Sequence, residues 1–545
     1  MKRILLVMLS LGLVLAFSAS AMAVDVKFSG SYYAAGMYLD KTTLNRNSYT
    51  NVSTVAAVST LSAYPTLAGL ASMPAFGTIN FAGFSALSTC TTTAYSGNST
   101  AFYYQRLRVD TDFIVSPGLK LVTRFDAMER IWGAARSGAS AGGDSFTASD
   151  ISSNGSRAES ENIAFDVAYI DYVSPIGLFR VGYMPSGTWG SSFGDSEFNG
   201  TPDPRLVYAI PIGPVAIGAS MTKSGERSKS YIYTTNYQTD RDYEKYAAFV
   251  NWDKNKDYQA GLAFEYRRIA LNKTAPDAAS PLVPLYSAFA QSYALNPYAR
   301  AKFGPVTINA EATYAWGQVD WEDNNATTFS VNTIKIENVS AYLDVMADFK
   351  MVYGGLTFAY VSGDDPGTTD KLEGGLAKGG RDFNPTLIMF NYERGYWAGP
   401  LAGYGATGNT SPWINIANQV VGGTSSALTA ENEMINVWLF QGKVGVRPVA
   451  GLDINASLTY ANAATKPASI NTTTYAAGPS VMNNALGWEL DLTGTYKLTN
   501  NLSYMLGAGY LWTGDYFQGD TIQGVSNDND VNNNYILVNK LTLTF

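Results

Sequence analysis

The chain has 545 residues, with 36 Tyr, 25 Phe, 10 Trp and 51 Gly; only 15% of its residues are charged, and its formal net charge is −8. One Cys and no His exclude an intrachain disulfide, His-based catalysis, haem attachment through a C-x-x-C-H motif and His-containing zinc sites. This much Tyr and Gly with so little charge is unusual for a soluble protein and typical of a β-barrel whose outer face contacts lipid.

The start of the chain has the pattern of a secretory signal peptide. Two basic residues precede an apolar run over residues 4–17, and small residues ending at Ala23 provide a cleavage site. A transmembrane anchor is the alternative, but the run is shorter than the roughly 18 residues that such a helix needs. We therefore expect residues 1–23 to be removed and residues 24–545 to form one barrel domain.

Alternation of apolar and polar residues predicts strands along the rest of the chain. Residues 24–38 form the first strand, and a long loop over residues 39–100 follows it. The next two strands, 103–115 and 119–130, are joined by a tight Ser-Pro-Gly turn. Their charged residues share one parity and should face the lumen, because an Arg that faces lipid costs about 2–4 kcal/mol. The basic residues predicted to line the pore are Arg106, Arg108, Lys120, Arg124 and Arg180.

The same order of strand, short turn, strand and long loop continues to the C-terminus. The further predicted strands cover residues 163–173, 179–184, 205–210, 215–222, 243–252, 258–269, 293–303, 306–316, 339–349, 353–361, 434–446, 452–460, 486–496, 502–512 and 535–545. Eighteen strands result, with sixteen as the nearest alternative, and both termini should lie in the periplasm. The fold class is therefore all-β, a closed antiparallel transmembrane barrel with short periplasmic turns and long extracellular loops. A soluble all-β protein is the alternative, but its strands would be shorter. A barrel of this size leaves an aqueous channel rather than a packed core.

Two stretches carry a family resemblance. The sequence L-V-T-R-F-D-A-M-E-R-I-W-G over residues 121–133 and the sequence R-V-G-Y-M-P-S-G-T-W-G-S-S-F-G-D-S-E over residues 180–197 resemble outer-membrane porins of delta-proteobacteria. The motifs lie in the first third of the chain, whereas the architecture resembles these porins throughout. The resemblance implies a water-filled channel for passive transport. It also implies that the barrel-assembly machinery reads the terminal aromatic residue Phe545, and that the porin forms homotrimers.

The resemblance further implies that the third long loop folds into the lumen. In this chain that loop covers residues 185–203, and its predicted constriction residues are Trp189, Asp195 and Glu197. Its acids would face the basic wall across the pore. A surface loop is the alternative, and the arginines could instead belong to a structural ladder of ion pairs. Other charges at lumen parity, among them Glu311, Glu489 and Lys540, are mixed in sign.

A second very long loop, residues 363–430, carries its own apolar segment over residues 387–390. A loop of this length could cap or plug the pore, or it could form a folded knob on the surface. No catalytic set, metal site or cofactor site is predicted, so we do not expect an enzyme.

The predicted function is passive diffusion of small hydrophilic solutes or ions through a porin in the outer membrane of a Gram-negative cell. The alternatives are a barrel scaffold for a porin–cytochrome electron conduit and a substrate-selective channel. The expected partners are outer-membrane lipid, lipopolysaccharide and the assembly machinery, with no nucleic acid.

Overall fold

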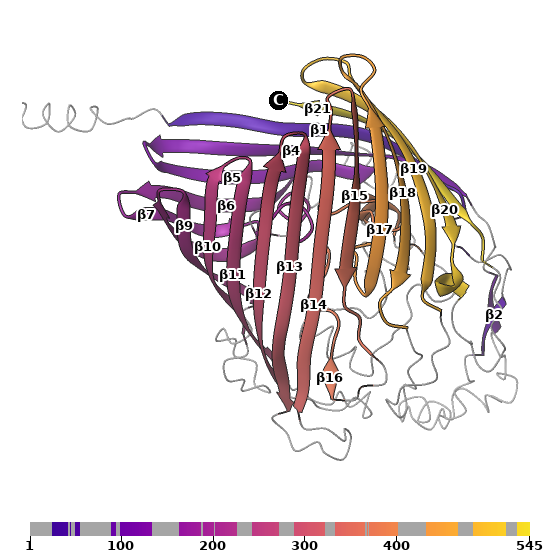
Figure 1. Cartoon of the computed structure of the whole chain (residues 1–545), viewed down its shortest axis with the longest axis horizontal. Helices are drawn as coiled ribbons and strands as arrows, with labels where there is room; N and C mark the ends of the chain where they lie inside the picture. The colour runs from indigo at the N-terminus through magenta and orange to yellow at the C-terminus, as the bar shows by residue number, and fades with distance from the viewer. Residues whose placement is uncertain are drawn as a thin grey trace, which may run out of the picture.

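The computed structural model describes residues 24–41, 44, 50–54, 89–93, 99–132, 163–186, 189–200, 202–225, 242–271, 288–321, 333–365, 368, 370–399, 401, 432–466, 483–518 and 531–545. In it, eighteen antiparallel strands close into a barrel (Figure 1). Each barrel strand pairs with the next barrel strand along the chain, and the last strand pairs back with the first. The predicted fold class and strand number are confirmed.

The strands differ from the predicted ranges mainly at their ends. The barrel strands are β1 (Asp25–Leu39), β4 (Thr100–Ser116), β5 (Leu119–Ile131), β6 (Ile163–Ser174), β7 (Gly177–Met184), β8 (Asp203–Ile212), β9 (Val215–Gly225), β10 (Tyr243–Asn255), β11 (Tyr258–Leu271), β12 (Ala288–Phe303), β13 (Val306–Trp321), β14 (Thr333–Asp348), β15 (Val352–Val361), β17 (Val437–Val446), β18 (Leu452–Ala463), β19 (Ala485–Lys497), β20 (Leu502–Thr513) and β21 (Asn534–Thr544). The elements outside the barrel wall are β2 (Thr50–Thr54), β3 (Thr89–Thr93), β16 (Lys371–Leu372), α3 (Tyr392–Ala398) and the 3-10 helix η4 (Asp515–Gln518).

The two faces of the wall differ as the sequence period of two requires. On β14, Ile336, Ser340 and Tyr342 are buried, whereas Val339 and Leu343, at the alternate positions, are exposed. The exposed side of the barrel carries large apolar side chains from most strands, which is the surface expected of a wall that faces lipid. Among them are Leu121, Phe165, Ile170, Val181, Leu206, Ile217, Leu262, Leu343, Leu356, Phe440, Leu458, Leu492, Leu506 and Leu541.

The first and last strands of the barrel begin and end at the rim that carries the short turns. The amide of Phe545 donates to the carbonyl of Gly30 over 3.1 Å, and the amide of Gly30 donates to the carbonyl of Phe545 over 2.9 Å. A Cβ at Gly30 would lie 2.3 Å from the carbonyl oxygen of Arg108 and 2.9 Å from the ring of Phe545. The closing strand therefore needs a glycine where the terminal ring crosses β1.

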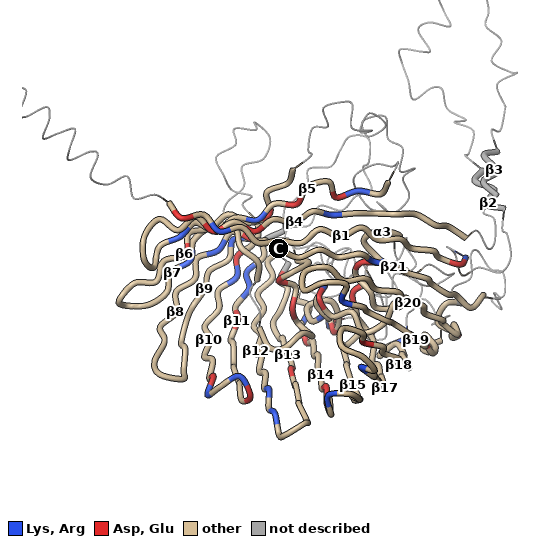
Figure 2. The backbone as a smooth tube through the Cα atoms, turned by 90° about the horizontal axis from the view of Figure 1, so that it is seen from above, with Lys and Arg blue, Asp and Glu red and all other residues tan. Residues whose placement is uncertain are grey.

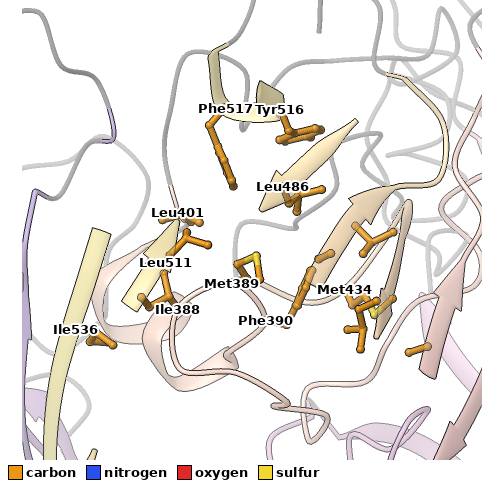
Figure 3. Packing of buried hydrophobic residues seen from close by; sticks show 14 of the residues in the cluster. Ile388, Met389, Phe390, Leu401, Met434, Leu486, Leu511, Tyr516, Phe517 and Ile536 are labelled. Atoms are coloured by element: carbon orange, nitrogen blue, oxygen red, sulfur yellow. The ribbon is translucent and has the colours of Figure 1, made fainter. Parts of the chain in front are cut away.

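Apolar side chains occupy part of the lumen. A cluster of buried apolar residues fills one side of it, and the segment Ile388, Met389 and Phe390 lies at its centre (Figure 3). These side chains pack on lumen-facing residues such as Leu439 and Leu511 of the surrounding wall. The physical reason is that a connection between strands folds inward and brings its own apolar side chains, which the alternation of the strands alone does not reveal.

Some predictions fall on residues that the structure does not describe. These are the signal peptide over residues 1–23, most of the loop over residues 39–100, and residues 402–431 of the second long loop. Among the described residues, no helix is long and apolar enough to span a membrane.

Candidate functional site

The predicted basic residues lie on the lumen side of the wall, where they form a ladder of ion pairs. Arg108 on β4 binds both carboxylate oxygens of Asp126 on β5, over 2.7 and 2.6 Å, and stands directly opposite it in the strand register. Arg124 on β5 donates to Asp110, its register partner on β4, over 2.8 Å. Along the backbone of this part of the barrel, basic and acidic residues lie close to one another (Figure 2).

The remaining basic residues repeat this arrangement. Lys120 binds Asp112 over 2.7 Å, and Arg180 on β7 binds Asp171 on β6 over 2.9 Å. Arg106 lies 3.5 Å from Glu129, and its guanidinium sits over the ring of Tyr33, 5.2 Å from the centroid. All five predicted pore-lining residues therefore have a carboxylate partner on a neighbouring strand. This geometry matches the alternative of a structural ladder.

The connection between β7 and β8 enters the lumen, and we call its residues 189–200 the first inner loop. One carboxylate on the opposite wall, that of Glu311 on β13, accepts four consecutive backbone amides of this loop. The donors are the amides of Ser191 (2.6 Å), Ser192 (2.9 Å), Phe193 (3.2 Å) and Gly194 (3.0 Å). The hydroxyl of Ser191 donates to the same carboxylate over 2.6 Å. Glu311 thus anchors the loop through its main chain.

Aromatic contacts fix the first inner loop against β12 and β14. The indole nitrogen of Trp189 donates to the carbonyl of Asn296 over 3.0 Å, and its ring meets Tyr298 edge-on at 5.2 Å. The ring of Phe193 stacks on Tyr342 at 5.2 Å with the two planes 3° apart. Trp189 therefore holds the loop against the wall by packing and by one hydrogen bond.

The other side of the first inner loop touches the arginine ladder in a way that the sequence did not predict. Arg124 donates to the backbone carbonyl of Glu197 over 3.4 Å, and Arg108 donates to the backbone carbonyl of Phe198. The carboxylate of Asp195 accepts the amide of Glu197 over 2.8 Å. The expected pairing of the loop acids with the arginines is thus replaced in these contacts by backbone carbonyls, because the wall acids already occupy the guanidinium groups.

Asp195 lies where a carboxylate is hard to ionise. Burial raises the pKa of its carboxyl to about 6, although the hydrogen bond from the amide of Glu197 acts in the opposite direction. The nearby carboxylates of Asp382, Glu197 and Glu311 raise the pKa further. This loop residue therefore changes charge in a mildly acidic range.

A second inward segment docks on the first, and we call its residues 370–399 the second inner loop. The carboxylate of Asp382 accepts the amides of Phe198 and Asn199 over 2.9 and 3.0 Å. The amide of Gly380 donates to the carbonyl of Phe193 over 2.7 Å. The described part of the 363–430 loop thus lies inside the barrel rather than as a knob on its surface.

The second inner loop has its own anchor on the wall. The carboxylate of Glu489 on β19 accepts the amides of Leu387, Ile388 and Met389 over 3.0, 2.6 and 2.9 Å. This arrangement repeats the one at Glu311, since one wall carboxylate again binds consecutive backbone amides. A second contact joins Lys540 of β21 to both carboxylate oxygens of Glu393, over 2.8 and 2.9 Å.

The helix α3 of the second inner loop leaves a cavity beside the wall. The rings of Tyr392 and Tyr396 stack at 5.7 Å, and Trp397 packs on Tyr104 of β4 at 4.8 Å. Between this helix and strands β1, β4 and β21 lies a cavity of about 620 Å³. Arg106 and Arg108 line it, together with Lys540 and the ring of Phe545.

The anchors Glu311 and Glu489 are the functional residues to which sequence reasoning gave no role. A signal for them exists in the strand register. Glu311 stands opposite Tyr298 and Tyr342, and Glu489 stands opposite Thr459 and Leu511. An acid of the lumen wall with only neutral cross-strand neighbours needs a partner from elsewhere. Within the described ranges, no group of acidic or Cys side chains is placed to hold a metal ion.

Comparisons with known proteins give only distant likenesses. No family model and no curated protein matches the chain. The outer membrane protein opdK from Pseudomonas aeruginosa is 10% identical, with a TM-score of 0.39 over 95% of this chain and 99% of that chain. OccK8 (OprE) of the same organism is 10% identical, with a TM-score of 0.41 over 95% and 98% of the two chains. OccK2 (OpdF) is 9% identical, with a TM-score of 0.42 over 95% and 98%. At these values the likeness assigns neither a family nor a solute to this chain.

Proposed function

We propose that this chain is an outer-membrane channel for the passive diffusion of small hydrophilic solutes or ions, narrowed by two inner loops. The outer face of the barrel is apolar and its inner face carries paired charges, which suits a wall between lipid and water. Eighteen strands enclose a lumen wide enough for solutes.

The observation that carries this proposal is the docking of the first inner loop across the lumen. Its contacts reach from the arginine ladder on β4 and β5 to Glu311 on β13. A loop that is held on both sides of the barrel reduces the cross-section of the lumen. The path that remains is lined by polar groups, as a selective diffusion channel requires.

A sheath for a multihaem cytochrome is less compatible with the interior. Such a sheath needs an empty lumen, but the second inner loop and its apolar cluster occupy one side of this barrel. The proposed location is the outer membrane of a Gram-negative cell, and the proposed partners are its lipid, its lipopolysaccharide and the assembly machinery that reads Phe545. A homotrimer remains a prediction from the resemblance.

Conductance of the full-length mature protein in planar lipid bilayers tests the proposal. We expect stepwise insertions with ohmic current in potassium chloride. The folded state of each preparation is checked by its heat-dependent shift in gel mobility. A folded barrel that inserts and carries no current would contradict a diffusion channel.

A further inference from the structure

We propose that the cavity beside α3 binds small neutral polyhydroxylated solutes, of the size of one or two sugar rings. This inference rests on the proposed function, because it names the class of solute that the channel would hold on its way through. The volume of about 620 Å³ lies within the range of roughly 300–1,000 Å³ that is usual for small-molecule sites.

The charges around the cavity are already neutralised. Lys540 is bound by both oxygens of Glu393, and Arg108 is bound by both oxygens of Asp126. Arg106 pairs with Glu129 and lies under the ring of Tyr33. An anionic solute would have to displace one of these carboxylates, whereas a neutral solute would leave every pair intact. The cavity therefore favours neutral over charged solutes.

The wall of the cavity offers hydroxyl groups that can both donate and accept. Ser29 and Ser31 of β1 and Thr542 of β21 line it. The hydroxyls of a polyol also donate and accept, so they can satisfy these groups. Asn384 and Asn391 of the second inner loop also line the cavity, and their side-chain amides are held by hydrogen bonds to the backbone of that loop.

The inner loop adds aromatic faces. Tyr392 and Tyr396 line the cavity as a stacked pair, and Trp397 meets Tyr396 edge-on at 5.0 Å. The guanidinium of Arg381 sits over the Tyr392 ring, 5.2 Å from its centroid, so the pair presents ring edges and the remaining parts of its faces to the cavity. The carbon-bound hydrogens of a sugar ring form an apolar face that packs on such rings, while its edge carries hydroxyls. Aromatic faces on one side and hydroxyls on the other thus match the two kinds of surface that a sugar presents.

Three sugars of similar size and different charge test whether the cavity prefers neutral, anionic or cationic solutes. Galactose is neutral, galacturonate is an anion and galactosamine is a cation, and each is added to single channels of the full-length protein in planar bilayers. The measured quantity is the concentration that halves the ion current or produces half-maximal current noise. We expect galactose to act at the lowest concentration of the three.

Variants then locate the effect in the cavity. Tyr392→Leu removes one aromatic face and should raise the half-blocking concentration of galactose about tenfold, whereas Tyr392→Phe keeps the ring and should raise it less than threefold. The double variant Ser31→Ala and Thr542→Val removes two hydroxyls of the wall and should also raise it about tenfold. The control is Ser220→Ala, which removes a hydroxyl on β9, outside the lining of the cavity.

Each outcome has a distinct meaning. Stronger block by galacturonate or galactosamine than by galactose would overturn the preference for neutral solutes. An ohmic channel on which none of the three sugars acts would overturn the binding site and leave the diffusion channel intact. A folded barrel that inserts and carries no current would overturn the proposed function itself. Equal effects of the cavity variants and Ser220→Ala would place the site elsewhere.

Discussion

Replacing Glu311 by Gln should release the first inner loop from the lumen wall. The carboxylate of Glu311 accepts four backbone amides of the loop over 2.6 to 3.2 Å and the hydroxyl of Ser191 over 2.6 Å. Gln keeps one acceptor oxygen, but it loses the negative charge and brings an amide group that cannot accept. The loop amides facing this group would then lack a partner.

The size of the effect follows from the number of bonds. A hydrogen bond to a charged group contributes about 1.5–3 kcal/mol, and we count the loss as two such bonds, or about 3–6 kcal/mol, since Gln retains part of the contact. Each 1.4 kcal/mol changes an equilibrium tenfold, so the ratio of docked to undocked loop should fall by roughly 10² to 10⁴. The lumen would spend more time in a wider state.

Single-channel conductance measures this change. We expect Glu311→Gln channels to carry a larger mean current with more fluctuation than the original protein. Glu337→Gln is the matched control, because the Glu337 side chain is 49% exposed and its nearest cation is Lys371, 3.4 Å away. If Glu311→Gln folds and its conductance equals that of the control, the loop is held by Phe193 and Asp382 instead, and the anchor reasoning fails.

Four further predictions concern the second anchor, the arginine ladder, Asp195 and the C-terminus, and the first three use the same bilayer preparation. Glu489→Gln should loosen residues 387–389 and increase conductance independently of Glu311→Gln; identical currents in the single and double variants would refute separate anchors. Arg124→Glu places a second acid beside Asp110 and should shift the reversal potential in a salt gradient toward cations; an unchanged potential would remove the ladder from the conducting path. The pKa of Asp195 is raised to about 6 in the docked loop, so ionisation of this carboxyl favours the undocked loop. Docking of the first inner loop should therefore weaken as the pH rises from about 4 through 6, and the current should increase. Asp195→Asn should abolish that increase, and a persistent pH response would assign it to another group. Phe545→Asp should reduce the amount of heat-modifiable barrel in cells, and normal amounts would argue against a terminal assembly signal.

The barrel itself could be predicted from the sequence because each strand carries its own evidence. Alternation along β14 separates Tyr342 from Leu343, and the cost of a lipid-facing Arg sends Arg124 to the lumen without knowledge of any neighbour. These are local properties, and they fix the strand count and the side of each residue. The pairing of the charges follows from the strand register, which places Arg124 opposite Asp110.

The inner loops could be predicted only in outline. The apolar segment that includes Ile388 indicated a packed element within the second long loop, and the structure buries it. Its docking site could not be predicted, because the partners of Glu489 are backbone amides about a hundred residues away, and a backbone amide has no sequence signature. For the same reason the role of Glu311 could not be predicted, because in the sequence it is one of many acidic residues expected to face the lumen.

Two pairs of lumen acids differ in what stands across from them in the sheet. Asp126 and Asp110 face arginines in register and serve the wall, which keeps buried charge paired. Glu311 and Glu489 face neutral residues on both neighbouring strands and bind loop backbone instead. A carboxylate in the barrel interior is costly unless it is satisfied, so an acid without a cross-strand cation needs donors from another part of the structure. The wall itself supplies them to Glu265, which binds Arg267 of its own strand, and to Asp344, which binds Lys443. Backbone amides of the inner loops supply them to Glu311 and Glu489, and these two anchors set the path left for solutes.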